Sequence, residues 1–299
     1  MSGNSLVLRS RSRTTGRSLK VRNNIPLKDY TLPVGERTCV MGILNVTPDS
    51  FSDGGRYLDP SRAVERAKQM AEEGADIIDI GGESSRPGSE RVAPEEELER
   101  VMPVIRALRG IIGVPLSIDT YKSKVAAQAL AEGVSVVNDI TALRGDADMA
   151  RTIAASGAGV ILMHMKGDPK NMQDAPFYDD VMDEISSYLS ESIALAVEAG
   201  VDPERIIIDP GIGFGKTTEH NLVILRELSR LKQLGKPVLI GTSRKAVIGT
   251  ITGKEVGGRL SGTAASFTAA IINGADIIRV HDVDQMRDVT CVADAIMSV

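Results

Sequence analysis

The sequence is poor in the residues that nucleic-acid stacking and membrane insertion require. Its 299 residues contain no tryptophan and only 3% aromatic residues, and the formal net charge is −5. Both features argue against general nucleic-acid binding, which uses positive charge and aromatic stacking. No uninterrupted apolar run approaches the ~20 residues that span a bilayer, so we expect no membrane segment.

Cysteine is also scarce, with only Cys39 and Cys291 present. Their separation fits no metal-binding spacing and, together with their number, predicts a reducing compartment and a cytoplasmic location. Both stand in apolar surroundings, so we predict that each is buried core filler.

The first 28 residues lack acidic side chains altogether but carry seven Arg and Lys residues. This composition also occurs in organelle transit peptides. Leu19–Arg22 and Tyr30–Val34 nevertheless resemble two short strands around Asn23-Asn24 and Pro26. We therefore predict a disordered tail over 1–16 and one domain over 17–299, which begins with a hairpin.

From Cys39 onward, apolar runs alternate with helical patterns. The predicted strands are 39–44, 76–80, 115–118, 135–138, 159–163, 205–208, 237–240 and 276–280. The predicted helices are 61–73, 94–109, 122–132, 148–156, 178–199, 219–234, 259–273 and 284–297. Eight evenly spaced strand–helix units, with strands apolar on both faces, favour an α/β fold of the (β/α)8 TIM-barrel class over a doubly wound open sheet.

Polar residues follow one predicted strand after another. They are Asn45, Glu83, Ser85, Arg86, Asp119, Asn138, Asp139, His164, Asp209, Ser243, Arg244, Lys245, Arg279 and His281. Any one of them alone would be typical of a turn or cap. In a barrel, however, the carboxyl ends of the strands converge on the face that carries the active site.

The chemistry of these side chains separates two parts of a site. Asp119, Asn138 and Asp209 suit a ligand edge with adjacent N–H donors, such as a 2-amino-4-oxo pteridine or guanine. Arg279 and His281, with Asn45 on the neighbouring strand, suit phosphate oxygens, and the Asn45 amide oxygen can also bind Mg²⁺. The alternatives are a turn cap for Asp209 and a structural Arg–His pair near Asp282.

Three glycine-containing stretches complete the predicted site. Residues 41–55 predict a buried strand that ends at Asn45 and is followed by a loop able to close over a ligand. Residues 209–216 lack the glycines of a phosphate-binding loop or a dinucleotide fingerprint. We expect their glycines to let the backbone approach a flat ligand, with Phe214 as an apolar wall. Residues 241–246 should open a short helix.

Eight motifs of the chain, in order, carry a family resemblance. They are GILNVTPDSF (42–51), DIGGESSRPG (79–88), SIDT (117–120), VND (137–139), LMHM (162–165), DPGIGFGK (209–216), SRK (243–245) and IRVH (278–281). Together they resemble the dihydropteroate synthases, folate-pathway transferases that join 4-aminobenzoate to a dihydropterin diphosphate and are the targets of sulfonamides. The resemblance covers nearly all of the barrel.

The resemblance implies a role for each matching residue. Implied catalytic residues are Asn45, Asp119, Asp209, Lys245, Arg279 and His281. Implied substrate-binding residues are Asp53, Ser85, Arg86, Asp119, Asn138, Met163, Asp209, Phe214, Ser243, Lys245 and Arg279. The family further implies Mg²⁺ as cofactor with Asn45 as its ligand, a homodimer, and an N-terminal β-hairpin that closes the bottom of the barrel. Ser85 departs from the threonine usual in the family, so a methyl group is lost beside the 4-aminobenzoate or sulfonamide.

The expected reaction is a dissociative substitution at the exocyclic methylene of the pterin. The polar inventory offers many charge stabilisers but no Ser–His or Cys–His nucleophile pair. Two alternatives share the barrel: a methyltetrahydrofolate-binding domain of a corrinoid methyltransferase, and a non-catalytic pterin-binding paralogue. Neither explains why the Thr-Pro-Asp-Ser-Phe loop and Ser243-Arg-Lys occur together with the full polar set.

Overall fold

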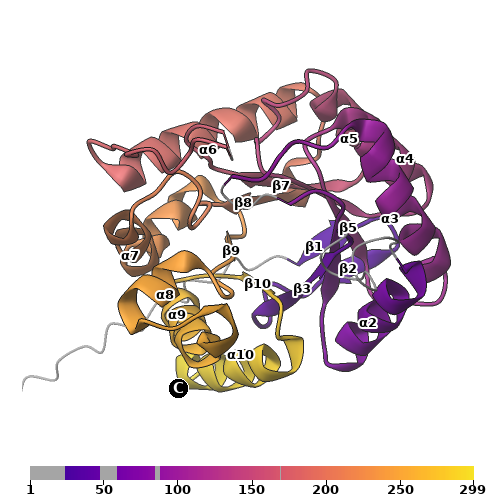
Figure 1. Cartoon of the computed structure of the whole chain (residues 1–299). Helices are drawn as coiled ribbons and strands as arrows, with labels where there is room; N and C mark the ends of the chain where they lie inside the picture. The colour runs from indigo at the N-terminus through magenta and orange to yellow at the C-terminus, as the bar shows by residue number, and fades with distance from the viewer. Residues whose placement is uncertain (1–23, 48–58, 85–87, 169) are drawn as a thin grey trace, which may run out of the picture.

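A parallel barrel ringed by helices forms the body of the molecule (Figure 1). The computed structural model describes residues 24–47, 59–84, 88–168 and 170–299. The barrel strands are β3 (Cys39–Asn45), β4 (Ile77–Gly81), β5 (Leu116–Asp119), β6 (Val136–Asp139), β7 (Gly159–Met163), β8 (Ile206–Asp209), β9 (Leu239–Ile240) and β10 (Ile277–Val280). Their order is β8-β7-β6-β5-β4-β3-β10-β9, and a parallel bridge from Ile208 to Val238 joins β8 to the segment before β9. The predicted (β/α)8 barrel is confirmed.

The helices within the described ranges lie close to the positions that the sequence predicts. They are α2 (Pro60–Glu72), α3 (Pro94–Leu108), α4 (Ser123–Ala131), α5 (Met149–Ser156), α6 (Val181–Glu198), α7 (Thr218–Arg226), α8 (Ala246–Thr252), α9 (Leu260–Ile272) and α10 (Val283–Met297). Capping side chains define several starts: Asp59 Oδ1 accepts from Ser61 N, and Asp180 Oδ1 accepts from Met182 N and Asp183 N. Such caps satisfy backbone donors that the first turn leaves unpaired.

One predicted helix and one predicted burial differ from the structure. The segment 219–234 is divided, because α7 ends at Arg226 and a 3-10 turn follows over Leu228–Leu234. Cys39 is buried as predicted, but Cys291 is exposed on α10, so the prediction of core filler is wrong for that residue. An apolar sequence neighbourhood on a helix includes its solvent face, and the residue lies on that face.

Period-two alternation along the strands separates two hydrophobic layers. Ile78 and Ile80 of β4 face the surrounding helices and belong to the large outer core. Ile77 instead faces the barrel axis, where it joins Met41, Val136 and other inward residues near the amino-terminal ends of the strands. Asp79 follows Ile77 on the same face. The inward face of the sheet therefore changes from apolar to polar towards the carboxyl ends of the strands.

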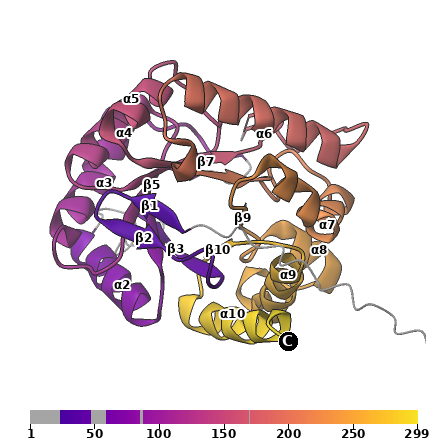
Figure 2. The ribbon, with the colours of Figure 1, turned by 180° about the vertical axis from the view of Figure 1, so that it is seen from behind.

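An antiparallel hairpin closes the bottom of the barrel (Figure 2). It consists of β1 (Ile25–Leu27) and β2 (Tyr30–Leu32), and its apolar side chains pack into the inner layer. The second strand is confirmed, but the first lies at 25–27, after the predicted Asn23-Asn24 turn. Ile25 and Leu27 are both buried with Pro26 between them, and proline is tolerated in such an edge strand. The predicted strand over Leu19–Arg22 and the tail over 1–16 lie outside the described residues.

None of the helices within the described ranges is long and apolar enough to cross a membrane.

Candidate active site

Strand register brings the predicted polar residues to one end of the barrel interior. Asn45, Gly81 and Asp119 are in register on β3, β4 and β5, and Asp119 pairs in turn with Asn138 of β6. Met163 of β7 is in register with Asp209 of β8. Each of these residues occupies the inward face of its strand near the carboxyl end. These predicted polar residues therefore converge at the carboxyl end of the barrel interior, as their positions at strand ends predict.

Arg279 forms ion pairs within this group of inward-facing polar residues, which we call the polar layer. Its Nε donates to Asp79 Oδ2 at 2.6 Å, and its Nη2 donates to Asp119 Oδ2 at 2.6 Å. Asn138 Nδ2 also donates to Asp79 Oδ2, at 3.0 Å. Although burial lowers the pKa of Arg279, the two carboxylates raise it overall, so the guanidinium remains charged. Asp282, which the structural alternative places beside an Arg–His pair, accepts a hydrogen bond from Arg244.

Burial shifts the protonation of the carboxylates in this layer. It raises the pKa of Asp119 to about 7, although Arg279 opposes the change, and the nearby charges of Asp79 and Glu97 add to it. Burial likewise raises the pKa of Asp209, against the opposing charge of Lys245. Asp119 therefore titrates near neutral pH, as groups in functional sites often do.

Lys245 contacts the glycine-rich stretch 209–216. Its Nζ donates to Ile212 O and lies 4.6 Å from the centroid of the Phe214 ring. Burial lowers its pKa to about 8, and Asp209 opposes the shift. Arg244, just before it, has a φ of +57°, a conformation uncommon for a residue with a side chain. Local backbone strain of this kind is concentrated at functional sites.

Ser243 and His281 are hydrogen-bonded to one another. His281 Nδ1 lies 2.9 Å from Ser243 Oγ, and His281 N donates to the same oxygen at 3.2 Å. Ser243 follows β9, and His281 follows β10, the strand that carries Arg279. The predicted anion-binding residue His281 thus contacts Ser243, a predicted substrate-binding residue.

Two glycines hollow out the layer between these side chains. A Cβ atom at Gly81 would lie 3.5 Å from Asp119 Cβ and 3.9 Å from Asn45 Oδ1. A Cβ atom at Gly241 would lie 3.8 Å from Arg279 Cβ and 3.9 Å from Lys245 Nζ. The absence of side chains at these two positions leaves room among the polar side chains of Asn45, Asp119, Lys245 and Arg279.

The glycine-rich stretch packs on protein backbone, which differs from the expected close approach to a ligand. A Cβ atom at Gly211 would lie 2.0 Å from His164 O, and one at Gly215 would lie 2.2 Å from Lys166 O. Beneath this stretch, Lys216 Nζ lies 2.9 Å from His164 Nδ1 and donates to Phe214 O at 2.9 Å. Burial and the charge of Lys216 lower the pKa of His164 to about 2, so this imidazole is neutral.

Other polar strand ends have structural partners. Asp139 accepts from Thr141 N and Leu143 N at 2.8 Å, which makes it a turn cap. Asp209 also caps its own turn, through Gly211 N at 2.7 Å. Glu83 accepts from Tyr121 Oη and Lys122 Nζ, at the base of the segment that contains Ser85 and Arg86. Some polar residues at strand ends thus have the capping role that is typical of such positions.

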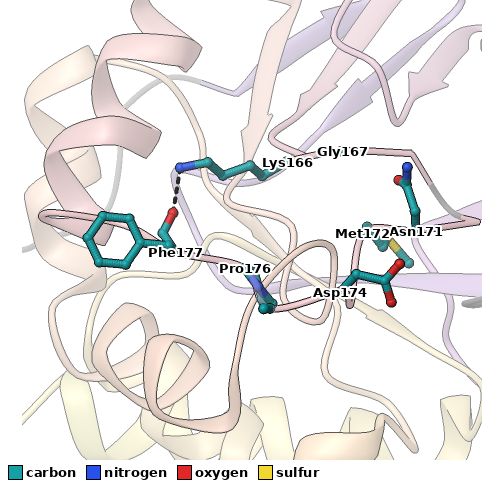
Figure 3. Close-up of a pocket in the computed structure, with 8 residues that line it drawn as sticks. Lys166, Gly167, Asn171, Met172, Asp174, Pro176 and Phe177 are labelled. Carbon is teal, nitrogen blue, oxygen red and sulfur yellow. Dashed lines mark hydrogen bonds between the residues drawn. The ribbon is translucent and has the colours of Figure 1, made fainter.

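The loop after β7 forms a pocket of its own (Figure 3). A cavity of about 450 Å³ is lined by residues between Lys166 and Phe177, and no predicted site residue within the described ranges lines it. Lys166 Nζ donates to Phe177 O at 2.6 Å, and Gln173 Nε2 donates to Gly213 O. This loop therefore braces the glycine-rich stretch from outside the polar layer.

Three predicted site residues, Asp53, Ser85 and Arg86, lie outside the described residues. Conversely, the sequence prediction omitted Asp79, which the structure places against both Arg279 and Asn138. The sequence did contain a signal for Asp79, because it is the only charged residue in the apolar run 77–80. A strand that is otherwise apolar on both faces rarely contains a charged residue without a partner.

The donor set around Asn45 suits a sparsely coordinated cation. Among the described residues there is no cluster of three or more His, Cys, Asp or Glu side chains that could hold a metal ion. Mg²⁺ typically keeps several waters and uses few protein ligands when substrate phosphates supply the rest. The Asn45 amide oxygen, which lies at the end of β3 beside Gly81, would be one such ligand.

Comparisons with known proteins agree on one family. The family model described as pterin binding enzyme matches residues 41–281. Dihydropteroate synthase from Synechocystis sp. is 48% identical over 91% of this chain and 94% of its own length. The enzyme of that name from Bacillus subtilis is 45% identical over 92% and 94%, respectively.

Solved structures give the same result. Yersinia pestis dihydropteroate synthase with a sulfonamide drug complex superposes with a TM-score of 0.88 at 42% identity, covering 93% of this chain and all of that one. The Xanthomonas albilineans enzyme with 4-aminobenzoic acid superposes with a TM-score of 0.86 at 45% identity, covering 92% and 98%. A structure of the latter enzyme contains 7,8-dihydropteroate.

Proposed function

The chain belongs to the dihydropteroate synthase family of pterin-binding enzymes, and from this membership we propose how its residues share the reaction. It is a transferase that condenses (7,8-dihydropterin-6-yl)methyl diphosphate with 4-aminobenzoate to give 7,8-dihydropteroate and diphosphate. The observation that best supports the residue assignment is the position of Arg279. Its guanidinium donates to Asp79 and Asp119 at the acceptor cluster, and the same strand end continues to His281, whose ring lies at Ser243, so one ligand at this strand end could contact both parts.

We assign the pterin ring to the acceptor-rich part of the layer. Asp119, Asn138 and Asp209 line one side of the barrel interior, and an edge with adjacent N–H donors matches their oxygens. Phe214 and Met163 supply apolar surface on the same face. Lys245, held between Ile212 O and the Phe214 ring, stands where it can donate to the ring's carbonyl oxygen or to 4-aminobenzoate.

We assign the diphosphate to Asn45, Arg279 and His281. Charged donors bind phosphate oxygens strongly, and the guanidinium is already held in position by two carboxylates. A bound Mg²⁺, held by Asn45 Oδ1 together with diphosphate oxygens, would supply Lewis-acid stabilisation of the leaving group. The remaining stabilisation comes from Arg279 and His281, which lie close to where negative charge develops.

We propose a dissociative order of bond changes. The C–O bond between the methylene and the diphosphate breaks first, and the electron pair leaves with the diphosphate. The resulting pterin cation lies among Asp119 and Asp209, whose negative charge stabilises it. The nitrogen of 4-aminobenzoate then forms the new C–N bond and loses one proton. Exclusion of water limits hydrolysis of the cation, which is the competing reaction.

A coupled assay tests this function directly. Purified protein, dihydropterin diphosphate, 4-aminobenzoate and Mg²⁺ should yield dihydropteroate and one equivalent of diphosphate. Diphosphate release that requires both substrates excludes a non-catalytic paralogue. Methyl transfer from methyltetrahydrofolate to a corrinoid, without dihydropteroate formation, would instead identify a methyltransferase domain.

We further propose a cytoplasmic homodimer. The two cysteines are free, and an exposed thiol such as Cys291 persists best in a reducing compartment. The adjoining helices α7, α8, α9 and α10 carry exposed apolar side chains, including Leu222, Ile251 and Ile272. Such residues favour association between copies. Light scattering coupled to size-exclusion chromatography should give twice the chain mass, and a monomer mass at micromolar concentration would contradict the dimer.

A further inference from the structure

Asp79 is a fully buried carboxylate in the middle of β4 that faces the polar layer from below. Its Oδ2 accepts hydrogen bonds from both Arg279 Nε and Asn138 Nδ2. Its Oδ1 is buried without a hydrogen-bond partner among the described residues. An unpartnered buried oxygen destabilises the folded chain, so its presence here calls for a functional explanation.

The bond to Asn138 determines which way that amide points. A carboxylate can only accept hydrogen bonds, whereas an asparagine side chain has one donating and one accepting end. Because Asp79 Oδ2 takes the donating end, Asn138 Oδ1 must be directed elsewhere. No described residue donates to that oxygen, which leaves it available to a ligand.

The amide orientation makes the pocket uniform in its hydrogen-bonding character. Asp119, Asp209 and Asn138 Oδ1 all present acceptors, which complements a 2-amino-4-oxo pteridine edge. If the amide were reversed, its NH2 group would face the ligand and would suit a 2,4-dioxo edge. A buried polar group that faces the wrong partner is left unpaired, which is how such sites discriminate strongly.

We propose that Asp79 is a positioning residue that sets the pteridine specificity of the site. It fixes the Asn138 amide with its oxygen towards the ligand and, through the same Oδ2, holds Arg279 beside Asp119. This inference rests on the proposed function, because it takes a pteridine as the ligand. It assigns the choice between 2-amino and 2-oxo rings to a residue that does not itself touch the ring.

The test compares two ligands in the full-length protein. Dissociation constants are measured by calorimetry for 6-hydroxymethylpterin and for its 2,4-dioxo counterpart. In D79N the new amide can donate to Asn138 Oδ1 and permits the reversed orientation. We expect the preference for the 2-amino ligand to fall by about tenfold or more. An equal loss of affinity for both ligands would mean a merely structural role and would overturn the proposal.

Two further variants show whether the effect passes through Asn138. Asp139 is a buried aspartate that follows Asn138 on β6 and caps its own turn among the described residues, so D139N should leave the preference unchanged. In the N138A background, D79N should no longer alter the ratio, because coupled residues are non-additive. A change in the ratio that persists in that background would contradict the mechanism.

If D79N does not fold, the wild-type protein still provides a test. The side-chain ¹⁵NH2 signals of Asn138, assigned by their loss in N138A, should move little when 6-hydroxymethylpterin binds, because that group stays on Asp79. A large shift would place the NH2 group on the ligand and refute the inference. Failure of the wild-type protein to bind either pteridine would instead refute the proposed function.

Discussion

Asp119 Oδ2 accepts a hydrogen bond from Arg279 at 2.6 Å, yet burial raises the pKa of the carboxyl group to about 7. The folded state therefore binds more protons than the unfolded state between pH 3.8 and about 7. The contribution of Asp119 to the free energy of unfolding falls as pH rises through that range. The ionised carboxylate, however, is the form that accepts ligand N–H groups. Folding and ligand binding thus favour opposite protonation states of this residue.

Pteridine affinity should weaken as the pH falls below 7. If the ligand binds only the ionised form of Asp119, the dissociation constant at pH 6 should be about tenfold higher than at pH 8. Calorimetric titration of 6-hydroxymethylpterin across this range measures the change. In D119N the corresponding part of the pH dependence should disappear. The same slope in both proteins would assign the titration to another group.

Loss of the anion-binding side chains should reduce turnover in protein that remains folded. R279A and N45A should each lower kcat by about 10²–10³-fold with Mg²⁺ present, because each removes a group beside the developing negative charge. Steady-state kinetics with both substrates measures this, with thermal melting as a check on folding. R226A alters an arginine that is 71% exposed on α7 and should leave kcat unchanged. Full activity of R279A or N45A with Mg²⁺ would contradict the assignment.

The glycine-rich stretch after β8 shows why local sequence patterns are ambiguous at the scale of an element. Gly211 has a φ of +69°, and its Cα approaches the backbone of His164 too closely for any side chain. The stretch thereby rests on the end of β7, while Lys216 beneath it binds Phe214 O. The position of Phe214 against Lys245 follows from this packing. Gly211 therefore allows two protein segments to pack together, and the candidate ligand site depends on both segments.

Gly211→Ala should destabilise the protein more than Gly235→Ala. Both glycines have nearly equal positive φ values, +69° and +66°, so the conformational cost of about 1 kcal/mol is shared. Only at position 211 would the new Cβ meet backbone, at 2.0 Å, whereas none lies within 4 Å at position 235. Urea unfolding measures both free energies. Equal losses would show that the approach to His164 relaxes without cost.

At the scale of the whole molecule, the barrel gathers residues that are far apart in the chain. Asp79 and Arg279 are 200 positions apart and 2.6 Å apart in space. Below them the inner apolar layer joins seven barrel strands to the N-terminal hairpin. Leu27 of that hairpin is fully buried. A Cβ atom at Gly159 would lie only 2.7 Å from Leu27 Cδ2. The hairpin fills the end of the barrel opposite to the site.

Leu27→Ala should destabilise the protein by about 2–5 kcal/mol, because it removes a fully buried side chain and leaves a cavity at the bottom of the barrel. Chemical denaturation measures the change. Ile111→Ala, at a side chain that is 63% exposed, should cost less than about 0.5 kcal/mol. The kcat of folded L27A should remain near the wild-type value, because the hairpin is remote from the polar layer. A large fall in kcat without loss of stability would contradict this separation.

The sequence alone determined the barrel, and it predicted which polar residues would stand at the carboxyl ends of its strands. Apolar strands evenly interrupted by helices have few ways to bury both faces, and polar residues at strand ends must then meet at one rim. For Asp119, Asn138, Asp209 and Arg279, the strand position specified the inward direction. Hydrophobic periodicity is a local property, so it can be read from neighbouring residues.

Only the tertiary structure decided how these side chains are paired. Asp79 emerged as the common partner of Arg279 and Asn138 because β4 lies midway between β10 and β6, the strands that carry them, in the order of the barrel. The first hairpin strand, the exposure of Cys291 and the contact of Gly211 with His164 likewise depend on segments distant in sequence. A residue's own pattern specifies its face and its polarity, whereas its partner is specified by the register and closure of the whole sheet.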